Sequence, residues 1–211
     1  MDLAPLDREI LDSFPTAAYI FRIGSSLHPE WFGPESDIDY IVVVEKFRLA
    51  MVNDYPRRTS PRMDAGFYID DAYNFFWRLS REPYDGHAVT ICIYTLDKFT
   101  DYIEKRSPPK MYILHEHHLL HGDQDALAAL KTANPPDIRT ARQDLATLRN
   151  PKYAAMWPWG WRSVSIMRGD GWLPNKAAIT AYVEEHYHGK LTNKTLLTQE
   201  LERLINEDER Q

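Results

Sequence analysis

The sequence predicts an α+β fold: a mixed sheet of about four or five strands, backed by helices and followed by a helical lobe. Short apolar, β-branched runs separated by turn-forming residues dominate the first 125 positions, which is typical of strands. From residue 126 onward, apolar residues recur at the spacing of amphipathic helices. We therefore expect two parts, residues 1–125 and residues 126–211.

Each element of the first part has its own signal. Residues 3–13 and 96–105 carry apolar side chains at helical spacing, and prolines at 108 and 109 end the second pattern. Strands are expected at three apolar runs, residues 16–23, 37–44 and 87–94. The middle run is apolar on both faces, which favours a central strand.

Two segments of the first part are ambiguous. The aromatic-rich range 67–79 is compatible with a strand or a helix, and residues 110–120 with a short helix or a helix leading into an edge strand. Across the boundary and in the second part, candidate helices occupy residues 124–133, 138–149, 176–186 and 195–206.

The most specific signal joins the first two expected strands. The first strand ends in Gly24-Ser25-Ser26, and Ser36-Asp37-Ile38-Asp39 opens the second. On a strand, Asp37 and Asp39 point to the same face because side chains alternate with a period of two. Such paired carboxylates suit Mg²⁺, which prefers one or two carboxylates together with substrate phosphates.

The glycine and serine of the turn suit the phosphates themselves. Gly24 lets a ligand approach the backbone closely, and Ser25 offers a hydroxyl and an amide N–H to a phosphate. Together with the carboxylates, these residues indicate a site for a metal-bound nucleoside triphosphate.

This arrangement resembles the signature of the DNA polymerase β-like nucleotidyltransferase superfamily, in its minimal bacterial and phage-type members. That signature is Gly-Ser, a short spacer, and Asp-x-Asp between apolar residues. A weaker resemblance, which includes the strand-to-helix passage at 90–99, extends to residue 125. The resemblance implies a polymerase β-like catalytic domain at residues 1–125 and a helical substrate-binding lobe at 126–211.

The resemblance also implies an activity: transfer of a nucleoside monophosphate from a triphosphate to a hydroxyl on RNA, a small molecule or a protein. Asp37 and Asp39 are then the ligands of Mg²⁺ or Mn²⁺. The nucleotide-binding residues are expected to be Gly24, Ser25, Ser26, Ser36, Arg57 and Arg58. The alternatives are a catalytically degenerate relative that binds nucleotide or RNA as a sensor or regulatory module, and a structural protein without nucleotide affinity.

One departure from the family pattern bears on catalysis. The superfamily usually places a third acid on the strand before the helix at 96–105, and here Thr90 stands at that position. The strand at 87–94 carries no acid. Asp85 is the nearest candidate in sequence for the third catalytic carboxylate, provided that a bulge at Gly86 corrects its strand parity.

Arg57 and Arg58 belong to a basic, proline-containing segment after the second strand. The segment is either a solvated loop or a flap whose arginines meet phosphates, because guanidinium groups match phosphate geometry. Aromatic residues leave a similar choice. Trp31 and Phe32 either cover a base or pin the loop to the core, and the tryptophans of 156–172 either pack or stack on bases.

Composition limits the remaining function classes. The net charge of −6 argues against tight nonspecific binding of nucleic acid. The single cysteine, Cys92, excludes an intrachain disulfide. No apolar run approaches the roughly 20 residues of a membrane span, and the first ten residues are too charged for a signal peptide. We expect a cytoplasmic protein with no membrane partner.

Four histidines lie between residues 115 and 121, two of them, His117 and His121, at the i, i+4 spacing of a metal pair. No cysteine is near them and the zinc-binding pattern around Glu116 is incomplete. We therefore expect a histidine-rich surface and no zinc.

Overall fold

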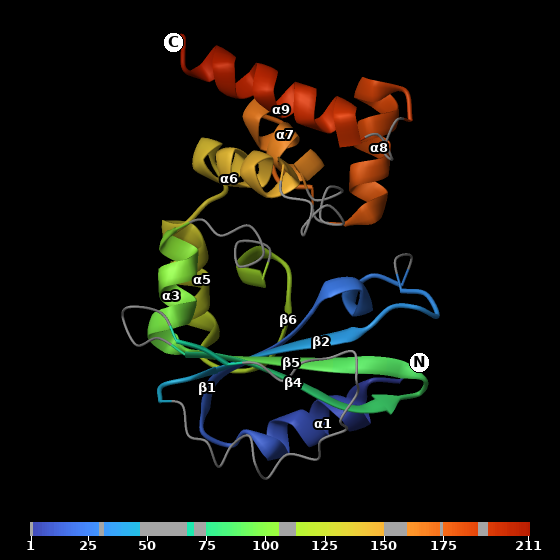
Figure 1. Ribbon diagram of the computed structural model, residues 1–211, viewed down its shortest axis with the longest axis vertical. Coiled ribbons are helices and arrows are strands. Elements are labelled where there is room, and N and C mark those ends of the chain that lie inside the picture. The colour runs from blue at the N-terminus through green and yellow to red at the C-terminus, as the bar shows by residue number, and fades with distance from the viewer. Residues whose placement is uncertain are drawn as a thin grey trace. The chain divides into compact units, whose positions relative to one another are not determined.

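A computed structural model describes residues 2–29, 32–46, 67–69, 75–105, 113–149, 160–173, 175–189 and 194–211, with the backbone alone at 67–69 and 75–82. It confirms the α+β class, with a mixed sheet in one compact unit and helices in another (Figure 1). The sheet unit comprises Met1–Glu104 and Ile113–Thr132, and the helical unit Lys105–Tyr112 and Ala133–Gln211.

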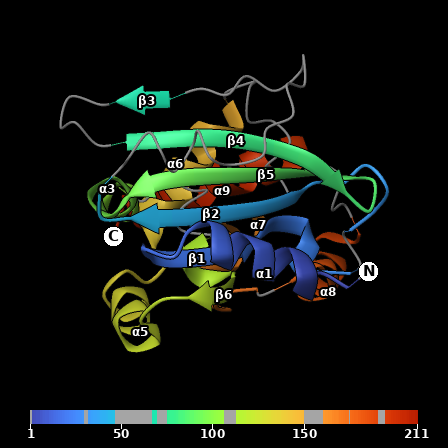
Figure 2. The same cartoon turned by 90° about the horizontal axis from the view of Figure 1, so that it is seen from below.

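In the part of the chain that the structure describes, the sheet has six strands, where about four or five were expected. They are β1 (Ala17–Ile23), β2 (Ile38–Val44), β3 (Phe67–Ile69), β4 (Phe75–Tyr84), β5 (His87–Thr95) and β6 (His118–His121). Figure 2 shows them side by side in the order β3-β4-β5-β2-β1-β6. Among the described strands only β2 and β5 pair in parallel, and β2 is an interior strand, as its doubly apolar pattern predicts.

The two ambiguous segments contain strands. Of the range 67–79, residues 67–69 form β3 and 75–79 belong to β4. The segment 110–120 is described from Ile113, where a helical stretch to His115 leads into the edge strand β6. Of the two alternatives predicted for this segment, a helix leading into an edge strand is therefore confirmed.

Helix α1 (Ala4–Ser13) covers one face of the sheet (Figures 1 and 2). Its proline lies in the first turn, where a missing backbone N–H costs nothing. Leu6 and Ile10 are fully buried against alternate residues of the central strands. These alternate residues are Ile38, Tyr40, Val42 and Val44 of β2, and Val89, Ile91 and Ile93 of β5.

The opposite face of the sheet carries α3 (Leu96–Glu104), as Figure 1 shows. Phe99 of this helix is buried and stacks on Phe21 of β1, with ring centroids 5.8 Å apart. The face of the sheet opposite α1 is therefore also packed by apolar side chains, where Phe21 meets α3. A short 3-10 helix, η1 (Gly24–Leu27), follows β1, and α5 (Gln124–Ala133) follows β6.

The helical unit is built from α6 (Ile138–Arg149), α7 (Gly160–Arg168), α8 (Lys176–Tyr187) and α9 (Lys194–Asp208). Helices α6, α7 and α9 pack on one another. Gly160 permits this packing, since a Cβ there would lie 2.9 Å from Leu197 Cδ2. Within the described ranges, none of the helices combines the length and apolarity of a membrane span.

Candidate functional site

Asp39 lies near the start of the central strand β2, between the neighbouring strands β1 and β5. It pairs with Ile23 on β1 and with Thr90 on β5. The residues that flank it on β2, Ile38 and Tyr40, belong to the core beneath α1. Because side chains alternate along a strand, Asp39 and Thr90 both point to the face opposite α1.

Gly24 places the backbone of the turn directly against the Asp39 carboxylate. It follows Ile23, the residue that pairs with Asp39, and its φ of +77° lies in the left-handed region. A Cβ at this position would stand 3.2 Å from Asp39 Oδ2. A side chain at position 24 would therefore crowd this carboxylate.

The serines of the turn have different roles. Ser26 Oγ donates a hydrogen bond to the Ile23 carbonyl at 3.1 Å, so this hydroxyl closes the turn of η1. Ser25 Oγ makes no hydrogen bond to any residue that the structure describes. Of the two serines, Ser25 is the one whose hydroxyl is not used to build the turn.

Ser36 helps to shape the loop before β2. Its hydroxyl accepts a hydrogen bond from the Gly33 N–H at 3.0 Å, and its carbonyl lies 2.8 Å from His87 Nδ1 at the start of β5. The His87 ring in turn stacks on Phe32, with centroids 4.5 Å apart. Phe32 also packs against the core, which favours the pinning interpretation for this residue.

Asp37 immediately precedes β2 and, like Asp39, is half-buried. Two hard oxygen donors at the opening of a central strand match what Mg²⁺ takes from proteins when phosphates complete its shell. Across the described ranges, no group of three or more histidine, cysteine or acidic side chains is arranged to hold a metal ion.

A polar network on the α1 face of the sheet supports the turn, and no local sequence pattern indicates it. Asp7 of α1 accepts hydrogen bonds from the Tyr40 hydroxyl at 2.7 Å and from Arg22 Nε at 3.1 Å. Arg22 Nη1 also donates to the Ser26 carbonyl at 3.3 Å. The network therefore connects α1 and the strand of Asp39 with η1.

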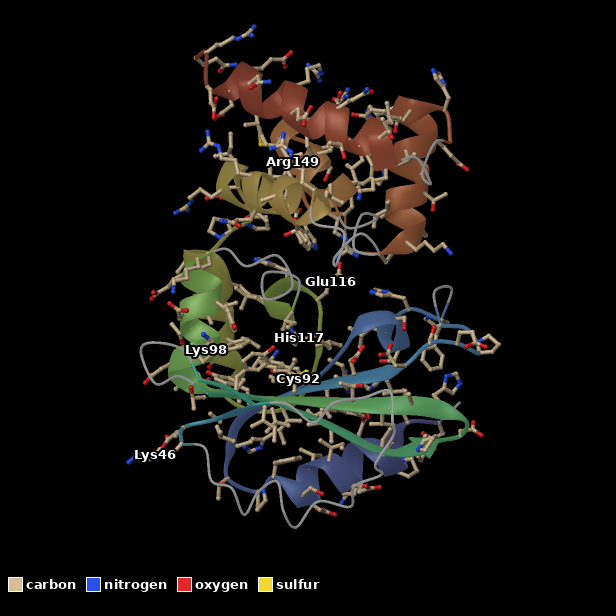
Figure 3. The ribbon with its side chains drawn as sticks, viewed as in Figure 1. Lys46, Cys92, Lys98, Glu116, His117 and Arg149 are labelled. Atoms are coloured by element: carbon tan, nitrogen blue, oxygen red, sulfur yellow. The ribbon has the colours of Figure 1, made fainter. Side chains whose placement is uncertain are left out.

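A second missed contact fixes the far end of η1. His28 Nε2 lies 3.5 Å from Glu116 Oε2, and both side chains are largely buried. The neighbouring His117 packs edge-on against Phe21, and burial lowers the pKa of His117. Figure 3 shows Glu116, His117 and Cys92 on the side of the sheet opposite α1.

Thr90 occupies the position beside Asp39 where the family resemblance expects an acid. Its side chain is 1% exposed, and Oγ1 has no hydrogen-bond partner among the described residues. A buried hydroxyl left in this way costs about 1–3 kcal/mol, so such groups are rare in native proteins. No signal in the sequence indicates that this threonine lacks a partner, because that depends on neighbours from other strands.

The expectation for Asp85 needs a correction. Asp85 and Gly86 form the two-residue turn of the β4–β5 hairpin, with φ values of 49° and 85°, and Asp85 is exposed. Positive φ at both positions is the pattern of a type I′ turn, which Asp-Gly favours. The pairing irregularity lies between Arg81 and Tyr84 of β4, so no bulge at Gly86 brings Asp85 to Thr90. Thr90 lies three strand positions, or roughly 10 Å, beyond His87, the first residue after this turn.

Several other expected residues lie outside the described ranges. These are Arg57 and Arg58 of the basic segment, and three of the tryptophans, Trp31, Trp157 and Trp159. In the helical unit, Trp161 is fully buried and lies 4.6 Å from the Tyr187 ring, so this tryptophan packs in the core.

Comparison with known proteins adds a structural likeness. No family model and no curated protein matches this sequence. The chain is similar to a crystal structure of a nucleotidyltransferase-like protein from Exiguobacterium sibiricum, with 11% identity and a TM-score of 0.37. The alignment covers 98% of this chain and 75% of that one. At this identity and TM-score, the likeness assigns no activity to the chain.

Proposed function

We propose that this protein is a metal-dependent nucleotidyltransferase that moves a nucleoside monophosphate from a triphosphate to a hydroxyl acceptor. The acceptor classes that fit are RNA, a small molecule or a protein. The observation that carries the proposal is the close approach of the Gly24 turn to Asp39, a carboxylate of the central strand.

The residues fit a divalent cation. Asp37 and Asp39 offer half-buried carboxylates, and the space that a Cβ would fill at Gly24 lies against one of them. When bound, Mg²⁺ or Mn²⁺ supplies charge neutralisation for the phosphates and the leaving pyrophosphate. The cation itself is part of the proposal.

The remaining residues of the site bind and orient the nucleotide. Gly24 and Ser25 present backbone N–H groups and a hydroxyl to the phosphates, whereas Ser26 and Ser36 hold the two loops in shape. Arg57 and Arg58 are proposed to add positive charge near the phosphates. With the nucleotide so oriented, catalysis is mainly a matter of positioning and electrostatic stabilisation.

Transfer forms a bond between the acceptor oxygen and the α-phosphorus, and breaks the bond from that phosphorus to the pyrophosphate oxygen. The acceptor proton must leave for a base. On the β5 side of Asp39 the structure has Thr90, a residue that is not a base at neutral pH. This observation favours the second candidate, a relative that binds metal–nucleotide as a sensor or regulatory module without transfer.

A labelling experiment separates the two candidates. The full chain is incubated with each α-labelled triphosphate, Mg²⁺ or Mn²⁺, and a pool of RNAs, and products are resolved on a gel. Label on RNA, or on the chain itself, supports the transferase. Binding of triphosphate without label transfer to these acceptors or to added small-molecule hydroxyls supports the sensor. If the chain binds no triphosphate in the presence of Mg²⁺ or of Mn²⁺, both candidate functions are contradicted.

A further inference from the structure

Three observations distinguish Thr90 from the other residues near Asp39. It is in register with Asp39 on the neighbouring parallel strand, it is 1% exposed, and its hydroxyl lacks a hydrogen-bond partner among the described residues. A hydroxyl both donates and accepts, so Thr90 can bond a ligand or a water placed beside Asp39. It carries no charge with which to balance a cation.

We propose that the Asp37–Asp39 pair holds a single divalent cation together with the triphosphate, and that the neutral Thr90 excludes a second cation. The inference rests on the proposed function and specifies its metal content. It assigns Thr90 to the site as a residue that sets the number of cations.

Charge explains why one cation fits and two do not. In two-metal sites the ions lie about 3.5–4 Å apart, and their mutual repulsion must be offset by anionic ligands. Here the β5 neighbour of Asp39 is neutral, and β5 carries no acid from His87 to Thr95. Nor do the described residues contain a cluster of three or more metal-binding side chains.

The strand beyond β5 continues the same pattern. Ser80 of β4 is in register with Thr90, so the row that runs from Asp39 across β5 to β4 has hydroxyl residues at its next two positions. One Mg²⁺ with one or two carboxylates, substrate phosphates and waters is a complete arrangement by itself. The expected ligand is therefore one cation–triphosphate complex.

Manganese counting tests the proposal. The full chain is titrated with Mn²⁺ while a triphosphate analogue with a methylene bridge between its α- and β-phosphates is saturating, and free Mn²⁺ is measured by electron paramagnetic resonance. The same titration of Asp39→Asn gives the background from other sites, including the histidines at 115–121. We expect one Mn²⁺ per wild-type chain above this background.

Two Thr90 variants test the cause of that count. Thr90→Asp should raise the count from one to two, because it adds the missing negative charge beside Asp39. Thr90→Val, which keeps the shape and removes the hydroxyl, should leave the count at one. The wild-type count decides the proposal even if the buried carboxylate of Thr90→Asp prevents folding.

Failure of the single-cation inference can be distinguished from failure of the proposed function. Two Mn²⁺ per wild-type chain, or two in Thr90→Val, would overturn the single-cation inference while leaving metal–nucleotide binding intact. No Mn²⁺ above the Asp39→Asn background would overturn the proposed function, and the inference with it. A folded Thr90→Asp variant that still binds one ion would show that Thr90 does not set the number.

Discussion

Gly24 and Asp39, fifteen positions apart in the sequence, lie close together: a Cβ on the glycine would be 3.2 Å from Asp39 Oδ2. This close approach arises because Asp39 pairs with Ile23, the residue before the glycine, across two antiparallel strands. It joins the two halves of the Gly-Ser and Asp-x-Asp motif into one arrangement of turn and carboxylate.

Gly24→Ala tests the importance of this close approach. The new methyl group requires Asp39 to move by a few tenths of an ångström, and an L-residue at positive φ costs about 1–2 kcal/mol. We expect triphosphate affinity in Mg²⁺ to fall about tenfold or more, measured by calorimetry. Gly86→Ala is the matched control, since Gly86 has a similar φ of +85° but no atom within 4 Å of a built Cβ.

The two glycine variants should lose similar stability and differ in nucleotide affinity. If Gly24→Ala leaves the triphosphate affinity unchanged, the close approach of Gly24 to Asp39 is not needed for binding. Equal loss of affinity in both variants would show that backbone strain, and not the position beside Asp39, causes the effect.

Tyr40→Phe should destabilise the sheet unit. The Tyr40 hydroxyl is fully buried and donates to the Asp7 carboxylate at 2.7 Å. Loss of a hydrogen bond to a charged group costs about 1.5–3 kcal/mol, and we expect the lower end because Arg22 still bonds Asp7. Urea unfolding measures the change.

Tyr84→Phe provides the comparison for Tyr40. Its hydroxyl donates to the Asp2 carbonyl at 3.1 Å in an exposed position, so its removal should cost no more than about 0.5 kcal/mol. Equal unfolding midpoints for wild type and Tyr40→Phe would contradict the described network.

The helical unit should lose stability in alkali because of Tyr187. Burial is the largest cause, and the hydrogen bond to Glu200 the next largest, of a rise in the pKa of Tyr187 from 10.0 to about 12. A folded-state pKa above the unfolded value means that stability is complete below pH 10 and is lost as the pH rises through 12. Burial raises the pKa of Tyr182 in the same direction, so it contributes as well.

Urea unfolding of the helical unit across this alkaline range checks the assignment. Tyr187→Phe should reduce the loss of stability with pH, without abolishing it, because Tyr182 remains. Identical pH dependence in wild type and Tyr187→Phe would show that Tyr187 is not the group responsible.

The elements that the sequence predicts well are those with a long periodic pattern. The predicted ranges 124–133 and 138–149 coincide with α5 and α6, because an amphipathic stripe over several turns is distinctive. β6 could not be predicted firmly, since its four residues give no periodic signal and its two outer histidines are exposed. β3 and β4 begin in an aromatic run that suits helix and strand alike.

Within the site, local spacing was informative and long-range pairing was not. Asp39 could be placed because it lies on a strand whose parity the sequence shows. The bonds of Asp7 to Arg22 and Tyr40 span 15 and 33 positions, and no local pattern signals such contacts. Asp85 was misplaced although Asp85-Gly86 between two strand-like runs is itself a hairpin signal.

Calorimetry on a charge-matched pair of double variants tests whether Asp37 and Asp39 bind a metal–triphosphate. In one, Asp37→Asn is combined with Asp39→Asn. In the other, two exposed acids away from the site are changed, Asp12→Asn with Asp125→Asn. We expect the first to abolish Mg²⁺-dependent triphosphate binding with circular dichroism unchanged, and the second to bind like wild type. Equal affinity in the wild type and the Asp37, Asp39 variant would show that these carboxylates do not hold the metal–triphosphate.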